Sequence, residues 1–483
     1  MSAAAESQKH VVVIGGGITG LAAAHRLSEL DRSVKITLLE ASNRLGGVLE
    51  TVRHDGFLIE RSADNFITNI PYALDLCRRL GIEEQLSQTN DAHRRAFVVC
   101  RGRLESIPEG FLIMAPSRLW PVLTTPILSW RGKMRLAAEW FVRTGSGADE
   151  SLASFATRRF GREMYERLAQ PLVGGIYTAD PEKLSVRAAM PRFVKMEQEY
   201  GSLIRGARRG AAKATKANKR ESAARYSMFT TPREGMSSLV DALADRLPDG
   251  SVRLDAAVKQ ITQREQIVQH EAGKWSIAIA GDEPRTIEAD GVIVATPAHR
   301  AATLLGRLDR ELAAELEQIF CASCAIVSLG YSRSQIGHPL DGFGFVVPQI
   351  ERRQILSASF SSVKYAGRAP EGCELIRVFI GGACQADLVD LDDDALRTIA
   401  VEELVDLLTI DGEPIFARIS RWRGAMPQYH LGHIERIERI RSRAASHHGL
   451  ALAGNAYGGV GVPQCIQSGE QAAATVVAEL KST

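Results

Sequence analysis

The stretch that decides the fold is HVVVIGGGITG at residues 10–20, followed by KITLLEASNRLGG at residues 35–47. The apolar, β-branched run 10–14 is typical of a buried parallel strand, and LAAAHRLSEL after the glycines has helical spacing. Gly15, Gly17 and Gly20 fit the spacing G-x-G-x-x-G, in which glycines permit a tight turn, close approach of a pyrophosphate and close helix–strand packing. The stretch therefore predicts a Rossmann-like βαβ unit whose helix N-terminus binds a phosphate.

A carboxylate closes the second strand of this unit. Glu40 directly follows the apolar strand 36–39, and its oxygens would accept hydrogen bonds from two ribose hydroxyls. The same charge would repel a 2′-phosphate, so the position favours FAD or NAD over NADP. Arg44 and the glycine pair Gly46 and Gly47 come just beyond this acid. We expect them to meet the pyrophosphate from its other side.

Composition excludes several classes of protein. The chain of 483 residues has room for two or three domains, and 45% hydrophobic and 24% charged residues are ordinary for a soluble globular protein. A net charge of +2 gives no reason to expect nucleic-acid binding. Seven scattered cysteines fit reduced thiols, and Cys321 and Cys324 have no second pair near enough for a metal site. With no secretory signal and no long apolar run, we expect a cytoplasmic protein without a metal.

Hydrophobic patterning divides the chain into five segments. Residues 1–83, 226–297 and 421–483 carry buried strands and glycine turns expected to share one dinucleotide-binding domain. The last of these predicts a strand in LALAG, a glycine-dense loop over 455–465 and a helix over 466–480. Residues 84–225 are predominantly helical in pattern. Residues 298–420 are rich in strands, with one helix at 392–408, and predict a mixed sheet that covers the cofactor.

Two stretches raise the question of a surface partner. Residues 111–130, FLIMAPSRLWPVLTTPILSW, are interrupted by three prolines and Arg118, so they cannot form a regular spanning helix. We interpret them as core or substrate channel in preference to a membrane surface. The run 205–225 is rich in Lys and Arg and poor in apolar residues, which favours a solvated loop or helix over a site for an anionic partner.

Further stretches resemble the porphyrinogen oxidases, the oxygen-dependent FAD enzymes that make protoporphyrin or coproporphyrin in haem synthesis. The likeness covers nearly the whole chain. It rests on LAQPLVGGIYTADPEKLS at 168–185 and GNAYGGVGVPQC at 454–465, whereas the glycine motif is shared with amine oxidases and carotenoid desaturases. The resemblance implies FAD and an α/β fold with a Rossmann-like FAD-binding domain in three chain segments. It also implies a mixed-sheet substrate domain and a helical domain that docks on the membrane in some members.

The resemblance also implies which residues contact FAD. It places Gly15, Gly16, Gly17, Ile18, Thr19 and Gly20 at the pyrophosphate, Glu40 and Ala41 at the adenosine ribose, Val48 just past Arg44, Gly46 and Gly47, and Val258 on the adenine side. It places Ser62, Ala63, Asp64 and Asn65 near the isoalloxazine, and Trp422, Val460, Gly461 and Val462 at the flavin end. Residues 62–69 contain no Lys or Arg, so Arg61 or a residue from elsewhere would have to bind a substrate propionate. No general base is required or named.

The implied reaction is the six-electron oxidation of protoporphyrinogen IX to protoporphyrin IX by FAD and molecular oxygen, which forms hydrogen peroxide. Coproporphyrinogen III is the alternative substrate. Protoporphyrinogen IX is favoured because the loop 62–69 lacks a cation for two extra carboxylates. Phe345 and Phe360 are candidates for the pocket wall or for the core. The competing interpretations are a flavin amine oxidase, a carotenoid desaturase and a flavin-binding protein without activity. Peripheral association with the inner face of a membrane stays open, and the sequence predicts no oligomeric state.

Overall fold

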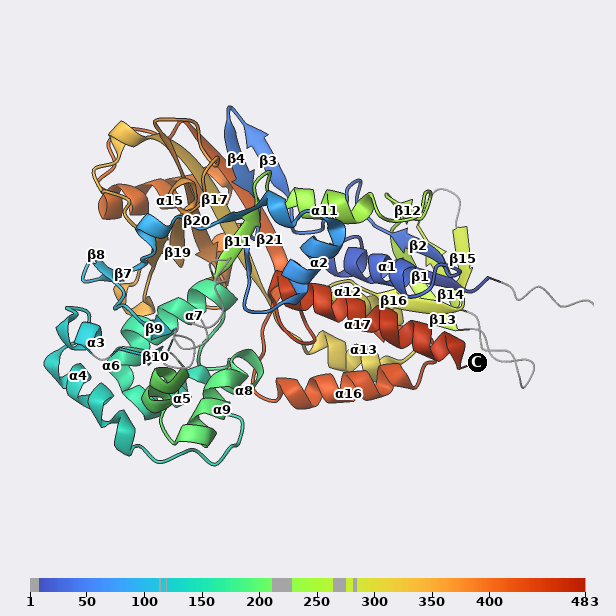
Figure 1. The fold of residues 1–483 in the computed structure, drawn as a ribbon, viewed down its shortest axis with the longest axis horizontal. Coiled ribbons are helices and arrows are strands. Elements are labelled where there is room, and N and C mark those ends of the chain that lie inside the picture. Colours follow the sequence, from blue (N-terminus) through green and yellow to red (C-terminus); the bar gives the residue numbers. More distant parts are fainter. Residues whose placement is uncertain are drawn as a thin grey trace, which may run out of the picture.

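Three distant parts of the chain build one parallel sheet. The computed structural model describes residues 8–112, 114–118, 120–210, 228–263, 275–280 and 285–482. Within it, five parallel strands lie in the order β12-β2-β1-β16-β22 (Figure 1). They are β1 His10–Ile14, β2 Lys35–Leu39, β12 Val252–Arg253, β16 Gly291–Val294 and β22 Leu450–Leu452. The α/β fold and the assembly of this sheet from three chain segments are therefore as the sequence predicted.

Both faces of this sheet are covered, which explains the unbroken apolar run in β1. Val11 and Val13 pack in one core with helices α1 (Ile18–Leu30), α2 (Tyr72–Leu80), α11 (Ser237–Ala244) and α17 (Val462–Lys481). Val12 and Ile14 pack in a second core with α12 (Ala298–Leu305), α13 (Arg310–Glu317), α16 (His433–Ala445) and a three-stranded sheet. That sheet consists of β13 Val258–Gln263, β14 Trp275–Ile279 and β15 Arg285–Ala289. A strand buried on both sides has no polar face to alternate.

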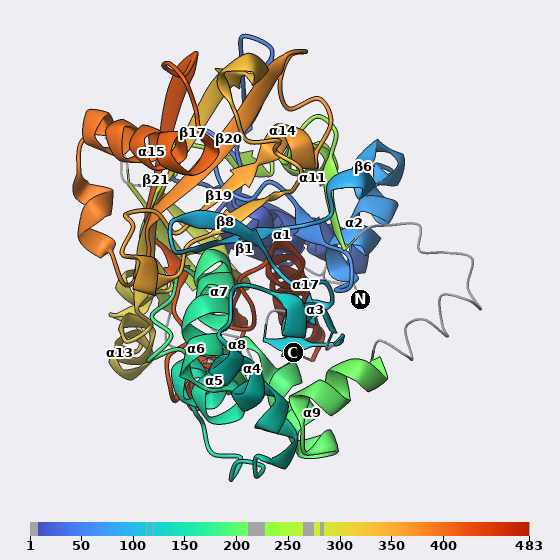
Figure 2. The ribbon, with the colours of Figure 1, turned by 90° about the vertical axis from the view of Figure 1, so that its left-hand side faces the viewer.

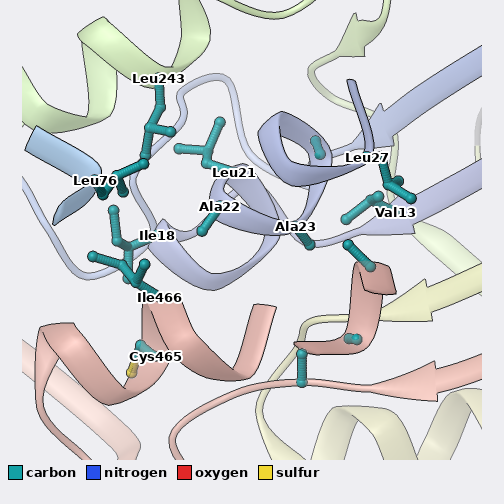
Figure 3. Close-up of a cluster of buried hydrophobic side chains, with 14 of the residues drawn as sticks. Val13, Ile18, Leu21, Ala22, Ala23, Leu27, Leu76, Leu243, Cys465 and Ile466 are labelled. Carbon is teal, nitrogen blue, oxygen red and sulfur yellow. The ribbon is translucent and has the colours of Figure 1, made fainter. Parts of the chain in front are cut away.

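Helix α1 occupies the centre of the first core. Its Ile18, Leu21 and Ala22 lie between α11 above and α17 below in Figure 3. Gly469 of α17 permits this contact, because a Cβ there would lie 2.2 Å from the carbonyl oxygen of Thr19. The close packing brings the N-terminal ends of α1 and α17 to the same region of the molecule (Figure 1).

A second, mixed sheet of seven strands lies in the upper part of the molecule in Figure 2. Its order is β21-β17-β20-β19-β18-β7-β8, all pairs antiparallel except β18 with β7. The strands are β7 Phe97–Cys100, β8 Arg103–Ser106, β17 Cys321–Ser332, β18 Gly344–Val346, β19 Ser357–Phe360, β20 Cys373–Gly381 and β21 Phe416–Pro427. Helix α15 (Asp393–Leu408) packs in the same core, which also contains Phe345 and Phe360.

A helical lobe lies beneath this sheet in Figure 2 and has its own apolar core. It comprises α3 Trp120–Thr124, α4 Trp130–Ala137, α5 Leu152–Phe160, α6 Arg162–Met164, α7 Gln170–Tyr177, α8 Val186–Ala189 and α9 Pro191–Tyr200. Short strands in the described part of the chain form three further small sheets. They are β3 Thr51–His54 with β4 Phe57–Glu60, β9 Phe111–Leu112 with β10 Ala115–Pro116, and β11 Phe229–Pro232 between β5 Phe66–Ile67 and β6 Leu86–Gln88. Helix α14 covers Ser361–Lys364.

Segment boundaries differ from the expected ones in three places. The β7–β8 hairpin lies in the range expected to be helical, yet Phe97 pairs with Phe345 in the mixed sheet. Helices α12 and α13 lie in the expected substrate segment but pack on the parallel sheet. Strand β21 runs across residue 420 without a break. These differences arise from pairing and packing between segments that are far apart in sequence, which local patterning does not register.

The stretch 111–130 also differs from expectation. Val122, Ile127 and Leu128 are buried, but Trp120 is 75% exposed and Trp130 is 70% exposed. The interpretation as core is therefore wrong for the two tryptophans. Residues 211–225 of the basic run lie outside the described residues. Among the described helices, none combines the length and apolar character needed to cross a bilayer.

Candidate functional site

The glycine turn between β1 and α1 is shaped to receive an anion. Gly15 has φ of +109°, a left-handed conformation that glycine adopts without strain. A Cβ at Gly20 would lie 1.9 Å from the carbonyl oxygen of Gly15, so a side chain there would force the turn apart. Helix α1 begins after Gly17 with no side-chain cap, and its first N–H groups are therefore free to donate to a phosphate.

Glu40 joins this turn to the end of β2. One carboxylate oxygen accepts the N–H of Gly16 at 2.6 Å, and the other accepts the N–H and hydroxyl of Ser42 at 2.9 and 2.8 Å. The Glu40 backbone pairs with residues 253–256, and Val258 begins β13 two residues further on. The predicted ribose and adenine contacts, including the exposed Ala41, thus lie beside the glycine turn.

The second glycine loop docks on the first. The Gly46 N–H donates to the Gly16 carbonyl at 2.8 Å, and a Cβ at Gly47 would lie 3.2 Å from the Cα of Gly17. Arg44 braces this loop from within: its guanidinium donates to the carbonyl oxygens of Gly47 at 2.6 Å and Leu45 at 3.1 Å. An ion pair with Glu50 at 3.1 Å uses the same guanidinium. Arg44 therefore fixes the loop that faces the turn.

The remaining predicted contacts surround one cavity of about 560 Å³. It lies between the parallel sheet, the seven-stranded sheet and α7. The predicted residues that line it are Ile18, Val48, Ser62, Ala63, Asp64, Asn65, Trp422, Val460, Gly461 and Val462. The other predicted residues belong to the glycine turns, to the end of β2 and to the start of β13, which were described above. Helix α17 begins at this cavity after Gly461, again without a side-chain cap, so free N–H groups face it.

The loop 61–65 is fixed from two sides. The Trp422 indole donates to the carbonyl of Arg61 at 2.7 Å, and Arg377 donates to the carbonyl of Ser62. Arg61 itself pairs with Glu50 at 2.7 Å and donates to Ser420 at 3.1 Å, while its guanidinium lies 5.9 Å from the Trp422 ring centre. The loop therefore presents its backbone to the cavity in one defined arrangement.

The glycine-dense loop before α17 is held by Tyr429. The Tyr429 hydroxyl donates to the carbonyl of Asn455 and accepts the N–H of Gly459 at 2.8 Å. Its ring stacks on His433 with 4.1 Å between ring centres. His433 is bonded to the Ala456 carbonyl at 3.1 Å. Burial lowers the pKa of His433 to about 4, so this support is neutral at pH 7.

The sequence interpretation missed the side chains that the mixed sheet and α7 contribute. Lys364, Arg377 and Cys324 line the cavity together with apolar residues. These apolar residues are Ile176, Tyr177, Ala322, Ile326, Phe379 and Met426. Arg377 in the buried strand ELIRVFIG was a detectable signal, because arginine is rarely buried without a partner. Phe345 and Phe360 do not line this cavity and belong to the core of the mixed sheet.

Charged groups meet at one corner of the cavity. Asp64 lies 3.5 Å from the Lys364 ammonium and 3.6 Å from the Arg377 guanidinium. Burial would raise the pKa of Asp64, but the two cations, with Arg368 behind them, outweigh it and hold that pKa below its usual range. Burial lowers the pKa of Lys364, and the Asp64 charge opposes this only in part.

Comparison with known proteins is consistent along the whole chain. A family model described as flavin containing amine oxidoreductase matches residues 18–477. The coproporphyrinogen III oxidase of Bacillus subtilis (strain 168) is 33% identical over 99% of this chain and 100% of its own length. The protoporphyrinogen oxidase of Homo sapiens is 30% identical, covering 97% of this chain and 98% of its own. A crystal structure named "Putative protoporphyrinogen oxidase", from Exiguobacterium sp. 255-15, superimposes with a TM-score of 0.84 at 31% identity, over 98% of this chain and 99% of that chain.

Proposed function

The chain belongs to the family of flavin-containing amine oxidoreductases, where its relatives include porphyrinogen oxidases, and we propose that it oxidises a porphyrinogen to the porphyrin. One observation carries the proposal. A single cavity of about 560 Å³ joins the predicted flavin contacts to an apolar wall from the mixed sheet and α7. Such a wall suits a large carbon-rich ring.

The residues present fit FAD, the cofactor of this family. Two helices, α1 and α17, begin at glycines without side-chain caps and point free N–H groups at the same ligand path. Gly17 and Gly47 approach without side chains, and Glu40 supplies acceptors beside them. Bound FAD supplies a two-electron acceptor that oxygen regenerates, so three rounds account for the six electrons removed from a porphyrinogen.

The protein's own side chains position and enclose the ring. Trp422 and Arg377 fix the loop 61–65 on one side, and Tyr429 fixes the loop before α17 on the other. Apolar residues such as Ile326 and Phe379 exclude water from the reacting carbon. We assign no general base, because the gain in aromaticity drives the oxidation and positioning is the contribution required of the protein.

The two candidate substrates differ in their carboxylates. Protoporphyrinogen IX fits a cavity whose basic lining residues, in the described part of the chain, are Lys364 and Arg377 with Asp64 between them. Coproporphyrinogen III is the second candidate, since it carries two further propionates and is named for relatives at 30 to 33% identity. We place protoporphyrinogen IX first because the cavity has few cations to bind the extra carboxylates of coproporphyrinogen III.

The test is porphyrin fluorescence after each porphyrinogen is added, in air, to purified enzyme loaded with FAD. We expect oxidation well above the spontaneous rate, and the larger kcat/KM identifies the substrate. If the enzyme oxidises neither porphyrinogen faster than that porphyrinogen oxidises spontaneously, the proposal is rejected. Acid precipitation is the companion measurement, because flavin that stays with the pellet would indicate the covalent attachment found in amine oxidases.

We also propose peripheral association with a membrane through α3, α4 and the turn after α4. This surface exposes Trp120, Trp130, Met134 and Phe141, the last to 87%, and Trp130 and Met134 are one helical turn apart. Indole rings favour the membrane–water interface, and Lys133 beside them would favour anionic lipid. Co-sedimentation with phosphatidylglycerol vesicles tests this. The variant Trp130→Ser/Met134→Ser should sediment less, whereas Phe320→Ser, which alters an exposed phenylalanine elsewhere, should behave like the original protein.

A further inference from the structure

One corner of the cavity holds more positive than negative charge. We call Asp64, Lys364 and Arg377 the cationic corner. They come from the loop after β4, the end of α14 and the middle of β20, and all three line the cavity. The Lys364 and Arg377 side chains are 13% and 2% exposed, so solvent provides little compensation for their charges.

Glu60 lies near the cationic corner, but its carboxylate is paired with other groups. Glu60 pairs with Arg368 at 3.0 Å and also accepts the Thr51 hydroxyl at 2.8 Å and the Met236 N–H at 2.9 Å. The second nitrogen of Arg368 donates to Thr231 at 2.8 Å. Neither Glu60 nor Arg368 lines the cavity. The two therefore neutralise each other behind the cationic corner.

Asp64 is then one carboxylate facing two cations. It lies at 3.5 and 3.6 Å from them, and neither distance is that of a strong charge-assisted hydrogen bond. Two buried polar atoms at the same place, the Arg377 Nε and the Ser62 Oγ, have no hydrogen-bond partner. A buried cation without a counter-ion is costly, so the corner is complementary to one additional anion.

The rest of the cavity limits what that anion can be. Ile176, Ile326, Phe379 and Met426 line the same cavity with apolar surface, so a small hydrated anion would leave most of the cavity unfilled. A large apolar body that carries a carboxylate satisfies both parts of the wall. Arg61, the other basic residue near the loop, is occupied by Glu50 and Ser420 and does not line the cavity.

We propose that Lys364, oriented by Asp64 and Arg377, binds one propionate carboxylate of the porphyrinogen and so determines how the ring is oriented in the cavity. The proposal rests on the proposed function, which supplies a substrate with that group. Lys364 is the contact residue. Arg377 acts through the Ser62 carbonyl and Asp64, and is a positioning residue.

The experiment compares the free-acid porphyrinogen with its methyl ester, which has the same ring without the charge. In the original enzyme the ester should have a KM about 10- to 100-fold higher, as for loss of a hydrogen bond between charged groups. In Lys364→Met the acid should become as poor as the ester, with kcat changed less than KM. Lys364→Arg should restore the preference for the acid. Lys481→Met is the control, because it removes a Lys–Asp ion pair at the far end of α17.

Equal KM values for acid and ester in the original enzyme would overturn the proposal. It would also fall if Lys364→Met raised both values by the same factor, which is the result of a purely structural role. Equilibrium binding of the porphyrin product, followed by its absorbance, tests the contact without turnover. If the original protein binds the free-acid porphyrin more tightly than its methyl ester and Lys364→Met removes this difference, the contact is supported. This holds even if the protein oxidises no porphyrinogen, in which case only the proposed function would fail.

Discussion

The Glu40 carboxylate connects two backbone segments that a bound dinucleotide needs in fixed positions. It accepts the Gly16 N–H at 2.6 Å and the Ser42 N–H at 2.9 Å, so it ties the glycine turn to the end of β2. Among the predicted contacts in the glycine turn and at the end of β2, both within the described residues, only the Glu40 carboxylate is a charged acceptor that could bind a ribose. Glu40 therefore supports the fold, and we propose that it also binds the cofactor.

Replacing Glu40 by Gln should weaken FAD binding without unfolding the protein. The amide keeps one acceptor and loses the charge, which should raise the Kd for FAD about 10- to 100-fold. Titration of the apoprotein with FAD, followed by flavin fluorescence, measures this. Glu317→Gln on the exposed face of α13 is the matched control. A Kd equal to that of the control would contradict the assigned role.

Asp64 should be important for stability because it is the carboxylate between two buried cations. Asp64→Asn leaves Lys364 and Arg377 uncompensated, and we expect the free energy of unfolding to fall by about 3 to 5 kcal/mol. Urea denaturation provides the measurement. Asp31→Asn removes an Asp partner of a lysine at the protein surface and should change little. Similar midpoints for the two variants would show that the cationic corner is not electrostatically coupled.

At the scale of elements, the contact between α1 and α17 holds the N-termini of both helices near the proposed cofactor site. Gly469 lets the helices approach, since a Cβ there would lie 2.2 Å from the Thr19 carbonyl oxygen. By helix propensity alone, Gly469→Ala would stabilise α17 by about 1 kcal/mol. We expect the opposite sign, a loss of about 1 to 3 kcal/mol from overpacking, measured by urea denaturation. A more stable variant would mean that the contact is loose.

The start of α16 should make stability depend on pH. Burial lowers the pKa of His433 to about 4, so below pH 6.5 the unfolded chain binds a proton that the folded one does not. The contribution is present above pH 6.5 and is lost as pH falls towards 4, at about 1.4 kcal/mol per pH unit. The difference in unfolding free energy between the original protein and His433→Asn should narrow over that interval. A constant difference would contradict the lowered pKa.

Elements differ in how well their sequence predicts them. The run HVVVI is buried on both faces, and the absence of alternating apolar and polar residues in it predicts a central parallel strand. Helix α17 begins at Val462, four residues before the expected start, because Pro463 occupies the first turn, where a missing N–H costs nothing. The β7–β8 hairpin was missed although its turn at Arg101 and Gly102 is local, and its place in the mixed sheet depends on the pairing of β7 with β18, more than two hundred residues away.

The same distinction holds for the site. The glycines and Glu40 follow strands in the chain, so motif spacing predicts them, whereas the loop 62–65 was expected only from the family resemblance. Lys364 and Arg377 enter the cavity from other elements, and only the folded sheet brings them to Asp64. Trp120 and Trp130 lie in an apolar stretch of the kind that usually forms core, yet both are exposed on the helical lobe. Composition cannot distinguish a buried tryptophan from one that faces a partner.

At the scale of the whole molecule, three parts of the structure line the cavity that holds the predicted flavin contacts. The parallel sheet is followed by the glycine turns and the start of α17. The mixed sheet supplies Arg377 and part of the apolar wall, α14 supplies Lys364, and α7 lines the helical side. Figures 1 and 2 show how the two large sheets and the helical lobe are arranged around one another. A substrate in this cavity would contact all three, which suits a large ring that must lie in one orientation.

The most direct measurement is anaerobic mixing of the FAD-loaded enzyme with protoporphyrinogen IX or coproporphyrinogen III, followed at the flavin absorbance band. We expect rapid bleaching with at least one porphyrinogen, recovery of the flavin spectrum when oxygen is admitted, and a matching rise of porphyrin fluorescence. A flavin that neither porphyrinogen reduces, in a protein that is folded and holds its cofactor, would contradict the assignment as a porphyrinogen oxidase.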